Sequence, residues 1–196
     1  EQEIILCSNE CKAIRFKEQS IRAMSRVAKG VRGMRVNLLA TIDEEELLDE
    51  DGDEISDDFA VSRVVSLVVA PKQGEILCAC ENGFGKRTPI DDYPTKGRGG
   101  KGVIAIKTSE RNGQLVKAIA VTGEEDVILI SDKGTLVRTP VAQIANDGRN
   151  AQGVKLIRIA DEEVLVGMAC VERDDDEIEE SEVLADVGQE ASESIE

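Results

Sequence analysis

Two sets of basic side chains recur along this sequence at matching intervals, and their chemistry suits phosphate binding. The first set follows three short turns and consists of Arg15, Arg87 and Arg138. The second set lies in polar, glycine-rich segments and consists of Arg26, Lys29, Lys96, Arg98, Lys101 and Arg149. Guanidinium and ammonium groups contact phosphate oxygens without reading bases, so a regular row of them is typical of a surface that follows a nucleic-acid backbone. All nine are candidate nucleic-acid contacts.

The first set also has a structural interpretation. Arg15, Arg87 and Arg138 stand in alternating strand sequence, where guanidinium groups can tie neighbouring strands together through internal hydrogen bonds. The residues alone leave both roles open for this set. The setting of Arg26, Arg98 and their neighbours favours phosphate contact, because a glycine-rich backbone can lie close to a nucleic acid and present amides as well as cations.

The residue types argue against bond chemistry. The chain has no histidine, so no Ser-His or Cys-His nucleophile pair and no histidine general base can form. Its carboxylates cluster in charge runs without the neighbours that would separate their pKa values. The segment 97–102 has glycine where a Walker loop needs Ser or Thr after the lysine. We therefore predict no catalytic residue and no cofactor site in this chain.

The cysteines and the single tyrosine each have a functional and a packing interpretation. The five cysteines could form a thiolate metal site, but Cys78 and Cys80 align with a leucine and a serine in the third repeat. We therefore predict reduced cysteines at ordinary strand positions and no metal site. Tyr93 could be a nucleophile, but isoleucine stands at both of its equivalent positions. This substitution pattern predicts an apolar packing site.

The basic side chains recur because the sequence repeats. The units begin at residues 4, 76 and 127, and the second and third are offset by 51 residues without a gap. Each reads as short apolar strands separated by turns, without a sustained helical period. Four short strands in about 50 residues predict an all-β fold of propeller-like blades at 1–70, 71–121 and 122–171.

The first turn of each unit carries a local prediction. Gly83 and Gly134 stand where a hairpin turn requires positive φ. The first unit has Cys11 at this position. A side chain disfavours the left-handed conformation, so we expect a differently shaped turn there.

Acidic residues are concentrated in two segments outside the repeat pattern. Residues 41–62 hold eleven acidic and no basic side chains, and residues 172–196 hold twelve acidic side chains and one arginine. The remaining chain has 23 Lys and Arg against 17 Asp and Glu, so the repeats are basic although the net charge is −16. We expect 41–62 to be an insertion in the first repeat and 172–196 to be a disordered tail. The tail either aids solubility or competes with DNA for the basic surface.

Three motifs resemble the C-terminal domain of the DNA gyrase A subunit. They are Asp132–Thr139 (DKGTLVRT), Gly148–Val154 (GRNAQGV) and Lys96–Val103 (KGRGGKGV). The resemblance covers residues 1 to 171 and implies a β-pinwheel, a propeller-like disc of about six blades. It implies that the basic edge wraps duplex DNA, so that the ATP-dependent type IIA topoisomerase can introduce negative supercoils.

The same resemblance implies partners and a location. They are duplex DNA, the rest of the gyrase A subunit, and the gyrase B subunit in a heterotetramer of two A and two B subunits. ATP and Mg²⁺ would bind elsewhere in the parent enzyme, in the cytoplasm, and no membrane contact is expected, because the sequence has no apolar run long enough to span a bilayer. Three repeats would form half of the disc, an incomplete ring.

The sequence departs from the family at one motif. The family box Gln-Arg-Arg-Gly-Gly-Lys-Gly is absent, and residues 96–102 are a near variant of it. We therefore read the chain as the last three blades and the tail. Two alternatives stay open: the C-terminal domain of the topoisomerase IV A-type subunit, which has similar blades, and a kelch- or WD40-like protein-interaction module. The near absence of aromatic residues, the lack of a Trp-Asp signature and the recurring cations count against the latter.

Overall fold

The computed structural model describes residues 2–36 and 62–173, whose regular elements are short β-strands and single 3-10 turns. The predicted all-β, repeat-built fold is confirmed. The strands are β1 (Glu3–Ser8), β2 (Lys12–Lys17), β3 (Val64–Ala70), β4 (Glu75–Cys80), β5 (Phe84–Pro89), β6 (Val103–Ile104), β7 (Leu115–Val121), β8 (Asp126–Ser131), β9 (Leu136–Pro140), β10 (Val154–Lys155) and β11 (Leu165–Val171). The 3-10 turns η1 (Glu18–Ser20), η3 (Ile90–Asp92) and η4 (Val141–Gln143) follow β2, β5 and β9.

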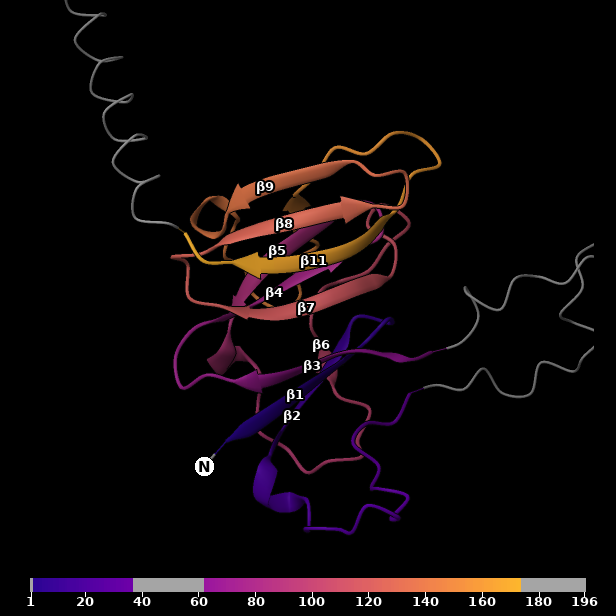
Figure 1. The fold of residues 1–196 in the computed structure, drawn as a ribbon, viewed down its shortest axis with the longest axis vertical. Helices are drawn as coiled ribbons and strands as arrows, with labels where there is room; N and C mark the ends of the chain where they lie inside the picture. Colours follow the sequence, from indigo (N-terminus) through magenta and orange to yellow (C-terminus); the bar gives the residue numbers. More distant parts are fainter. Residues whose placement is uncertain (1, 37–61, 174–196) are drawn as a thin grey trace, which may run out of the picture.

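The strands form three antiparallel sheets that stack one above another (Figure 1). The first has the strand order β3-β1-β2-β6, the second β10-β5-β4-β7, and the third, within the described residues, β11-β8-β9. Strand β7 contacts both β3 and β11, so these three strands line one side of the stack. The opposite edges carry β6 and β10.

The second and third repeats each contribute their shortest strand to the sheet of the repeat before them. Strand β6 lies in the second repeat but pairs with β2 of the first, and β10 of the third repeat pairs with β5 of the second. The glycine before each of these strands allows the approach, because a Cβ on Gly102 would lie 2.5 Å from the carbonyl oxygen of Ala13. Sheet membership therefore crosses the repeat boundaries read from the sequence, which remain a prediction.

The prediction that Cys11 gives its turn a different shape is wrong. Cys11 has φ 59°, in the same left-handed region as Gly83 at 75° and Gly134 at 90°. Its amide donates to Ser8 O at 3.0 Å, as that of Gly83 donates to Cys80 O at 3.0 Å. A single side chain in this region costs about 1 kcal/mol. Cys11 is 1% exposed, and burial of its side chain between sheets offsets that cost.

Two apolar cores lie between the sheets. The core between the first and second sheets includes Ile5, Cys78 and Tyr93, and the core between the second and third includes Leu77 and Leu129. Because the second sheet is covered on both faces, every residue of β4 after Glu75 is buried. Burial of Tyr93, at 1% exposure, agrees with its predicted packing role.

Two sequence predictions fall largely outside the described residues. The acidic insertion at 41–62 overlaps them only at Ser62, and the acidic tail at 172–196 only at Glu172 and Arg173. Both therefore stay predictions. In the described part of the chain, no helix has the length and apolar character needed to cross a bilayer.

Candidate nucleic-acid interface

The strand arginines join neighbouring sheets. Arg15 on β2 donates through Nε to Glu3 Oε2 at 2.7 Å and through Nη1 to Ile90 O at 2.7 Å and Tyr93 O at 3.2 Å. The first contact crosses the β1–β2 hairpin, and the other two reach η3 and the residue after it in the next repeat. Thr95 Oγ1 of that repeat also donates to Glu3, at 2.8 Å.

Arg87 repeats this arrangement at the next junction. Its Nη1 donates to Glu75 Oε2 at 2.8 Å and its Nε to Ile144 O at 2.8 Å. Arg138 pairs with Asp126 at 2.8 Å, and its side chain is 36% exposed against 14% for each of the other two. These contacts follow the structural interpretation that the sequence left open.

The glycine-rich loops lie side by side along the outer edge of the sheets. Arg98 donates through Nε to Ser20 O and through Nη1 to Arg32 O, both at 3.1 Å, which joins the second loop to the first. Arg149 Nη1 donates to Ile104 O at 3.2 Å and joins the third loop to β6, which directly follows the second loop. The three loops therefore form one continuous strip, which we call the loop edge.

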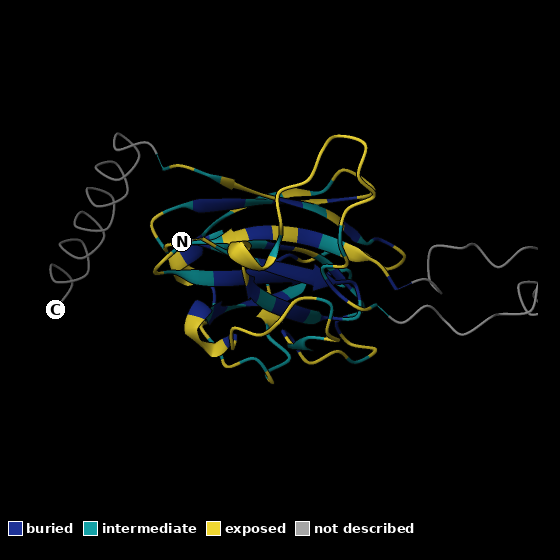
Figure 2. Cartoon of the chain, turned by 90° about the horizontal axis from the view of Figure 1, so that it is seen from below, coloured by how far each residue is buried: buried dark blue, intermediate teal, exposed yellow. Residues whose placement is uncertain are grey.

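The loop edge presents its basic groups to solvent. The side chains of Arg26, Lys29, Lys96 and Lys101 are exposed, and in residues 2–36 and 62–173 none of them makes an ion pair. Figure 2 shows that the loops are mostly exposed, whereas most of the buried residues lie on the strands. This edge combines exposed cations with glycine backbone, the arrangement that phosphate contact requires.

A third basic row is absent from the sequence predictions. Arg35, Lys107 and Arg158 occupy equivalent positions in the three repeats, and all are exposed. The amides of Arg35 and Lys107 donate to carbonyls of the following loop, Gly100 O at 2.8 Å and Ala151 O at 3.1 Å. Arg35 and Lys107 therefore lie directly beside the loop edge. The offsets of 72 and 51 residues would have found them.

Most of the thiols and the phenol are buried, so they are poorly suited to act as nucleophiles. Four of the five cysteines are buried. Burial, together with the nearby Cys80 thiol, raises the pKa of Cys78 to about 12, and burial also raises the pKa values of Cys7 and Tyr93. In the described residues no group of three or more possible metal ligands comes together.

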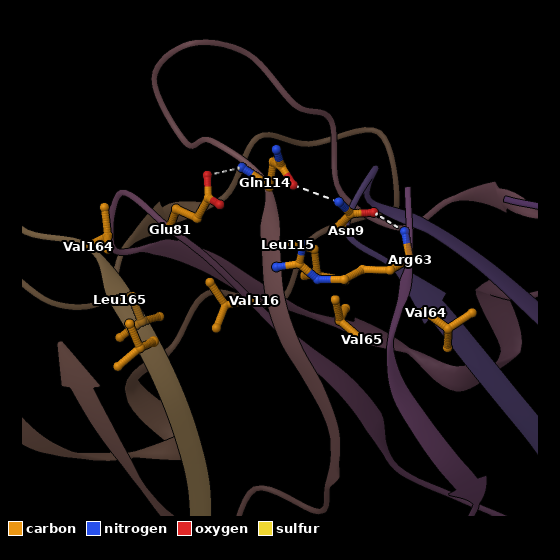
Figure 3. A pocket seen from close by; sticks show the side chains of 11 residues that line it. Asn9, Arg63, Val64, Val65, Glu81, Gln114, Leu115, Val116, Val164 and Leu165 are labelled. Atoms are coloured by element: carbon orange, nitrogen blue, oxygen red, sulfur yellow. Dashed lines mark hydrogen bonds between the residues drawn. The ribbon is translucent and has the colours of Figure 1, made fainter. Parts of the chain in front are cut away.

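A hollow of about 420 Å³ lies at the other side of the stack, where β3, β7 and β11 begin (Figure 3). Asn9 and Glu81 form part of its polar rim: Asn9 Nδ2 donates to Gln114 Oε1 at 2.7 Å, and Glu81 Oε2 accepts from the Gln114 amide at 2.8 Å. These bonds anchor the start of β7 to the turns of both neighbouring hairpins. None of the nine sequence-predicted cations is among the described residues that line this hollow.

Comparison with known families gives a consistent result. A family model described as "DNA gyrase C-terminal domain, beta-propeller" matches residues 2–56, 74–122 and 125–172. The DNA gyrase A subunit of Haemophilus influenzae is 46% identical over 187 residues, covering 91% of this chain and 21% of that protein. The Pseudomonas aeruginosa protein of the same name is 42% identical, covering 98% of this chain and 19% of that protein. The chain thus spans about a fifth of these relatives.

Solved structures share the fold at low sequence identity. The DNA gyrase A C-terminal domain superposes with a TM-score of 0.70 at 23% identity, covering 87% of this chain and 51% of that one. The C-terminal domain of DNA topoisomerase IV gives 0.69 at 17% identity, covering 87% and 47%.

Proposed function

Because the chain belongs to the DNA gyrase C-terminal domain family, we propose that its loop edge binds and bends duplex DNA without reading the base sequence. The observation that carries this proposal is the junction of three glycine-rich loops into one strip, through Arg98 and Arg149, with exposed cations along it. The proposed contacts are the loop set and the additional row, namely Arg26, Lys29, Lys96, Arg98, Lys101, Arg149, Arg35, Lys107 and Arg158. The acid-paired strand arginines are assigned to holding the sheets in place.

The physics of wrapping favours such a strip. Bending stiff duplex sharply costs on the order of several kcal/mol. Contacts to phosphates release condensed counterions, and each contributes irrespective of base identity. A continuous row of cations can therefore offset the bending cost along any sequence, whereas a single strong contact cannot hold a curved path.

In the parent protein we propose that this domain bends DNA for a type IIA topoisomerase that introduces negative supercoils. The chain contributes no catalytic residue to this reaction. The cleavage chemistry, ATP and Mg²⁺ belong to other parts of the assembly, which we propose contains two A and two B gyrase subunits in the cytoplasm.

Equilibrium binding to a short labelled duplex across a salt series tests the DNA-binding proposal. The logarithm of the association constant should fall linearly with log salt, with a slope of about 0.9 for each phosphate engaged. Two unrelated duplex sequences should bind equally. A folded chain, verified by circular dichroism, that fails to bind at low salt would refute the proposal and favour a protein-interaction surface.

A second candidate parent is topoisomerase IV, because its C-terminal domain shares the fold closely. Reconstituting the full-length parent protein with its ATP-binding partner separates the two. Negative supercoiling of a relaxed circle with ATP supports the gyrase assignment. Efficient decatenation without negative supercoiling supports topoisomerase IV.

A further inference from the structure

One basic side chain in the described part of the repeats is buried, and it makes no ion pair with an acid. Lys86 on β5 is 0% exposed, and its Nζ donates to Thr88 Oγ1 at 2.9 Å and to Gly148 O at 2.6 Å. Apolar residues, Ile14 and Val137, stand at the equivalent positions of the other repeats. Burying an ammonium group is costly even when it is hydrogen-bonded. Because an aliphatic residue is compatible with the fold at this position in the other repeats, packing alone does not explain why this repeat has a lysine.

The contacts of Lys86 place it beneath the third glycine-rich loop. Its neighbour Thr88 is 1% exposed and donates through Oγ1 to Asp147 O at 2.8 Å. The Asp147 amide donates to Arg87 O at 2.9 Å. Three consecutive residues of β5 thus hold the three successive peptide groups that precede Arg149.

The second loop shares the backbone contact, because the Lys96 amide donates to Arg15 O at 2.8 Å. Beneath it, however, Ile14 and Phe16 stand at the positions of Lys86 and Thr88 and offer no side-chain donor, and its own charges also differ. The Cδ1 of Ile14 would lie 3.5 Å from a Cβ placed on Gly100. The second loop carries Lys96 and Lys101 around Arg98, whereas the third carries Asp147 and Gln152 at the corresponding positions. Three basic side chains can share phosphate contacts on the second loop. On the third loop Arg149 stands alone among these positions.

Arg149 borders an open hollow of about 380 Å³, lined by Asp92, Gly148, Asn150 and Ala151 as well. The Asp92 carboxylate would oppose an anion there, so the direction of the Arg149 guanidinium decides whether a phosphate can approach. Its Nη1 is anchored at Ile104 O. The peptide groups that lead into Arg149 are those held by Lys86 and Thr88.

We propose that Lys86 is a positioning residue for DNA binding: from beneath, it fixes the Gly148 carbonyl, and thereby sets Arg149 to meet a DNA phosphate. This inference rests on the proposed DNA-binding function. Lys86 itself does not touch DNA, because it is fully buried. Burial also lowers the pKa of Lys86, as expected for a side chain that is kept at a cost to folding.

The substitution Lys86→Met tests this role. Met keeps the unbranched shape, removes the buried charge and leaves an apolar residue, as in the other repeats. We expect a Tm equal to or above that of the parent chain, with a loss of duplex affinity that approaches that of Arg149→Ala. One phosphate contact is worth on the order of tenfold in affinity at 0.1 M salt. Val137→Met, at the equivalent position of the third repeat, is the matched control and should leave binding unchanged.

A double-mutant cycle separates positioning from general stability. If Lys86 acts through Arg149, the two losses overlap, and the double variant binds about as well as Arg149→Ala alone. Combined with Lys101→Ala, on the second loop, Lys86→Met should give additive losses. Unchanged affinity in Lys86→Met, or additive losses with Arg149→Ala, would overturn the proposal. Thr88→Val, which frees the Asp147 carbonyl, provides a second variant with the same expected overlap.

Amide hydrogen exchange keeps this inference distinct from the proposed function. Lys86→Met should raise the exchange rate in the peptide covering residues 147–151 while leaving β5 protected, with or without DNA. If the parent chain binds no duplex, the DNA-binding proposal fails, and the exchange result still decides whether Lys86 orders this loop. Unchanged exchange in residues 147–151 contradicts the positioning role regardless of DNA binding.

Discussion

The strand arginines and the loop arginines recur at the same intervals, yet they lie in opposite settings. Arg15 and Arg87 are 14% exposed, and each contacts an acid on its own hairpin and carbonyl groups of the next repeat. Arg98 donates to two backbone carbonyl groups at the exposed surface, and neither contact involves an acidic side chain. Recurrence alone therefore does not identify a binding residue. The presence or absence of a fixed acidic partner distinguishes the two rows.

The acidic partner of each strand arginine can be recognised from a fixed spacing in the sequence. Glu3, Glu75 and Asp126 each precede a strand arginine by twelve residues. In a hairpin of this length, that spacing brings the two side chains to the same face of adjacent strands. The residue twelve positions before each loop arginine is isoleucine, lysine or valine. A guanidinium that is paired with a carboxylate and hydrogen-bonded to backbone carbonyls binds a phosphate weakly, whereas an exposed guanidinium without an acidic partner can bind it through its full charge.

The largest expected effect is the loss of stability on removing a strand arginine that is paired with an acid. Arg87→Ala removes a mostly buried partner of Glu75 and leaves the Ile144 carbonyl without its donor. We expect the free energy of unfolding to fall by about 2 kcal/mol, since Glu75, whose side chain is 17% exposed, loses its counterion and is left with the hydrogen bond from Asn146. Urea denaturation followed by circular dichroism measures the change.

Arg138→Ala is the control for this prediction. Its side chain is more exposed, and Asp126 keeps Arg173 Nε at 3.1 Å as a second partner. The loss should therefore be under about 1 kcal/mol. Equal losses for the two variants would show that exposure and sheet-to-sheet contacts do not distinguish the anchored arginines.

The next effect is on binding rather than stability. Arg98→Ala should lower duplex affinity on the order of tenfold at 0.1 M salt and reduce the salt slope by about one. Its two hydrogen bonds are exposed, so the Tm should change little. Fluorescence anisotropy at several salt concentrations gives both binding quantities. A stability loss as large as that of Arg87→Ala, with unchanged affinity, would place Arg98 among the structural arginines.

Much of this architecture can be predicted from the sequence because it depends on repetition. Equivalent apolar positions predict the strands, and the isoleucines equivalent to Tyr93 predict its burial. The pairing of β6 and β10 with the sheet of the preceding repeat is harder to predict, since both strands are two residues long and their partners lie in another repeat. Local propensity carries no information about such pairing.

The errors have physical causes as well. Cys11 adopts a conformation that its side chain disfavours, because tertiary burial outweighs the local preference. The row of Arg35, Lys107 and Arg158 follows from the repeat offsets, but these residues lie beyond the glycine-rich motifs. Lys86 could not be assigned from sequence, because an isolated lysine in a strand is ordinarily exposed. Its contact depends on the Gly148 carbonyl, which comes from another repeat.

The smallest expected effect is on the pH dependence of stability that comes from the acid-paired strand arginines. Partial burial of Glu3 opposes its ionisation, but hydrogen bonds from Thr95 and Arg15 outweigh this and hold the pKa of Glu3 below its ordinary value. A carboxyl with a lowered pKa in the folded state stabilises the fold above its unfolded-state pKa, about 4.3. That stabilisation is lost as the pH falls from there through the folded-state value.

Urea denaturation between pH 6 and pH 3 measures this contribution. We expect Glu3→Gln to be less stable than the parent chain at pH 6 and to lose less stability on acidification, because it cannot take up the proton that breaks the Arg15 contact. Glu110→Gln, at an exposed position, corrects for the general loss of one negative charge. Parallel pH profiles for the parent chain and Glu3→Gln would mean that the first anchored pair does not contribute to acid sensitivity. The Glu3–Arg15 contact would then give the first repeat no stability that the exposed loop arginines lack.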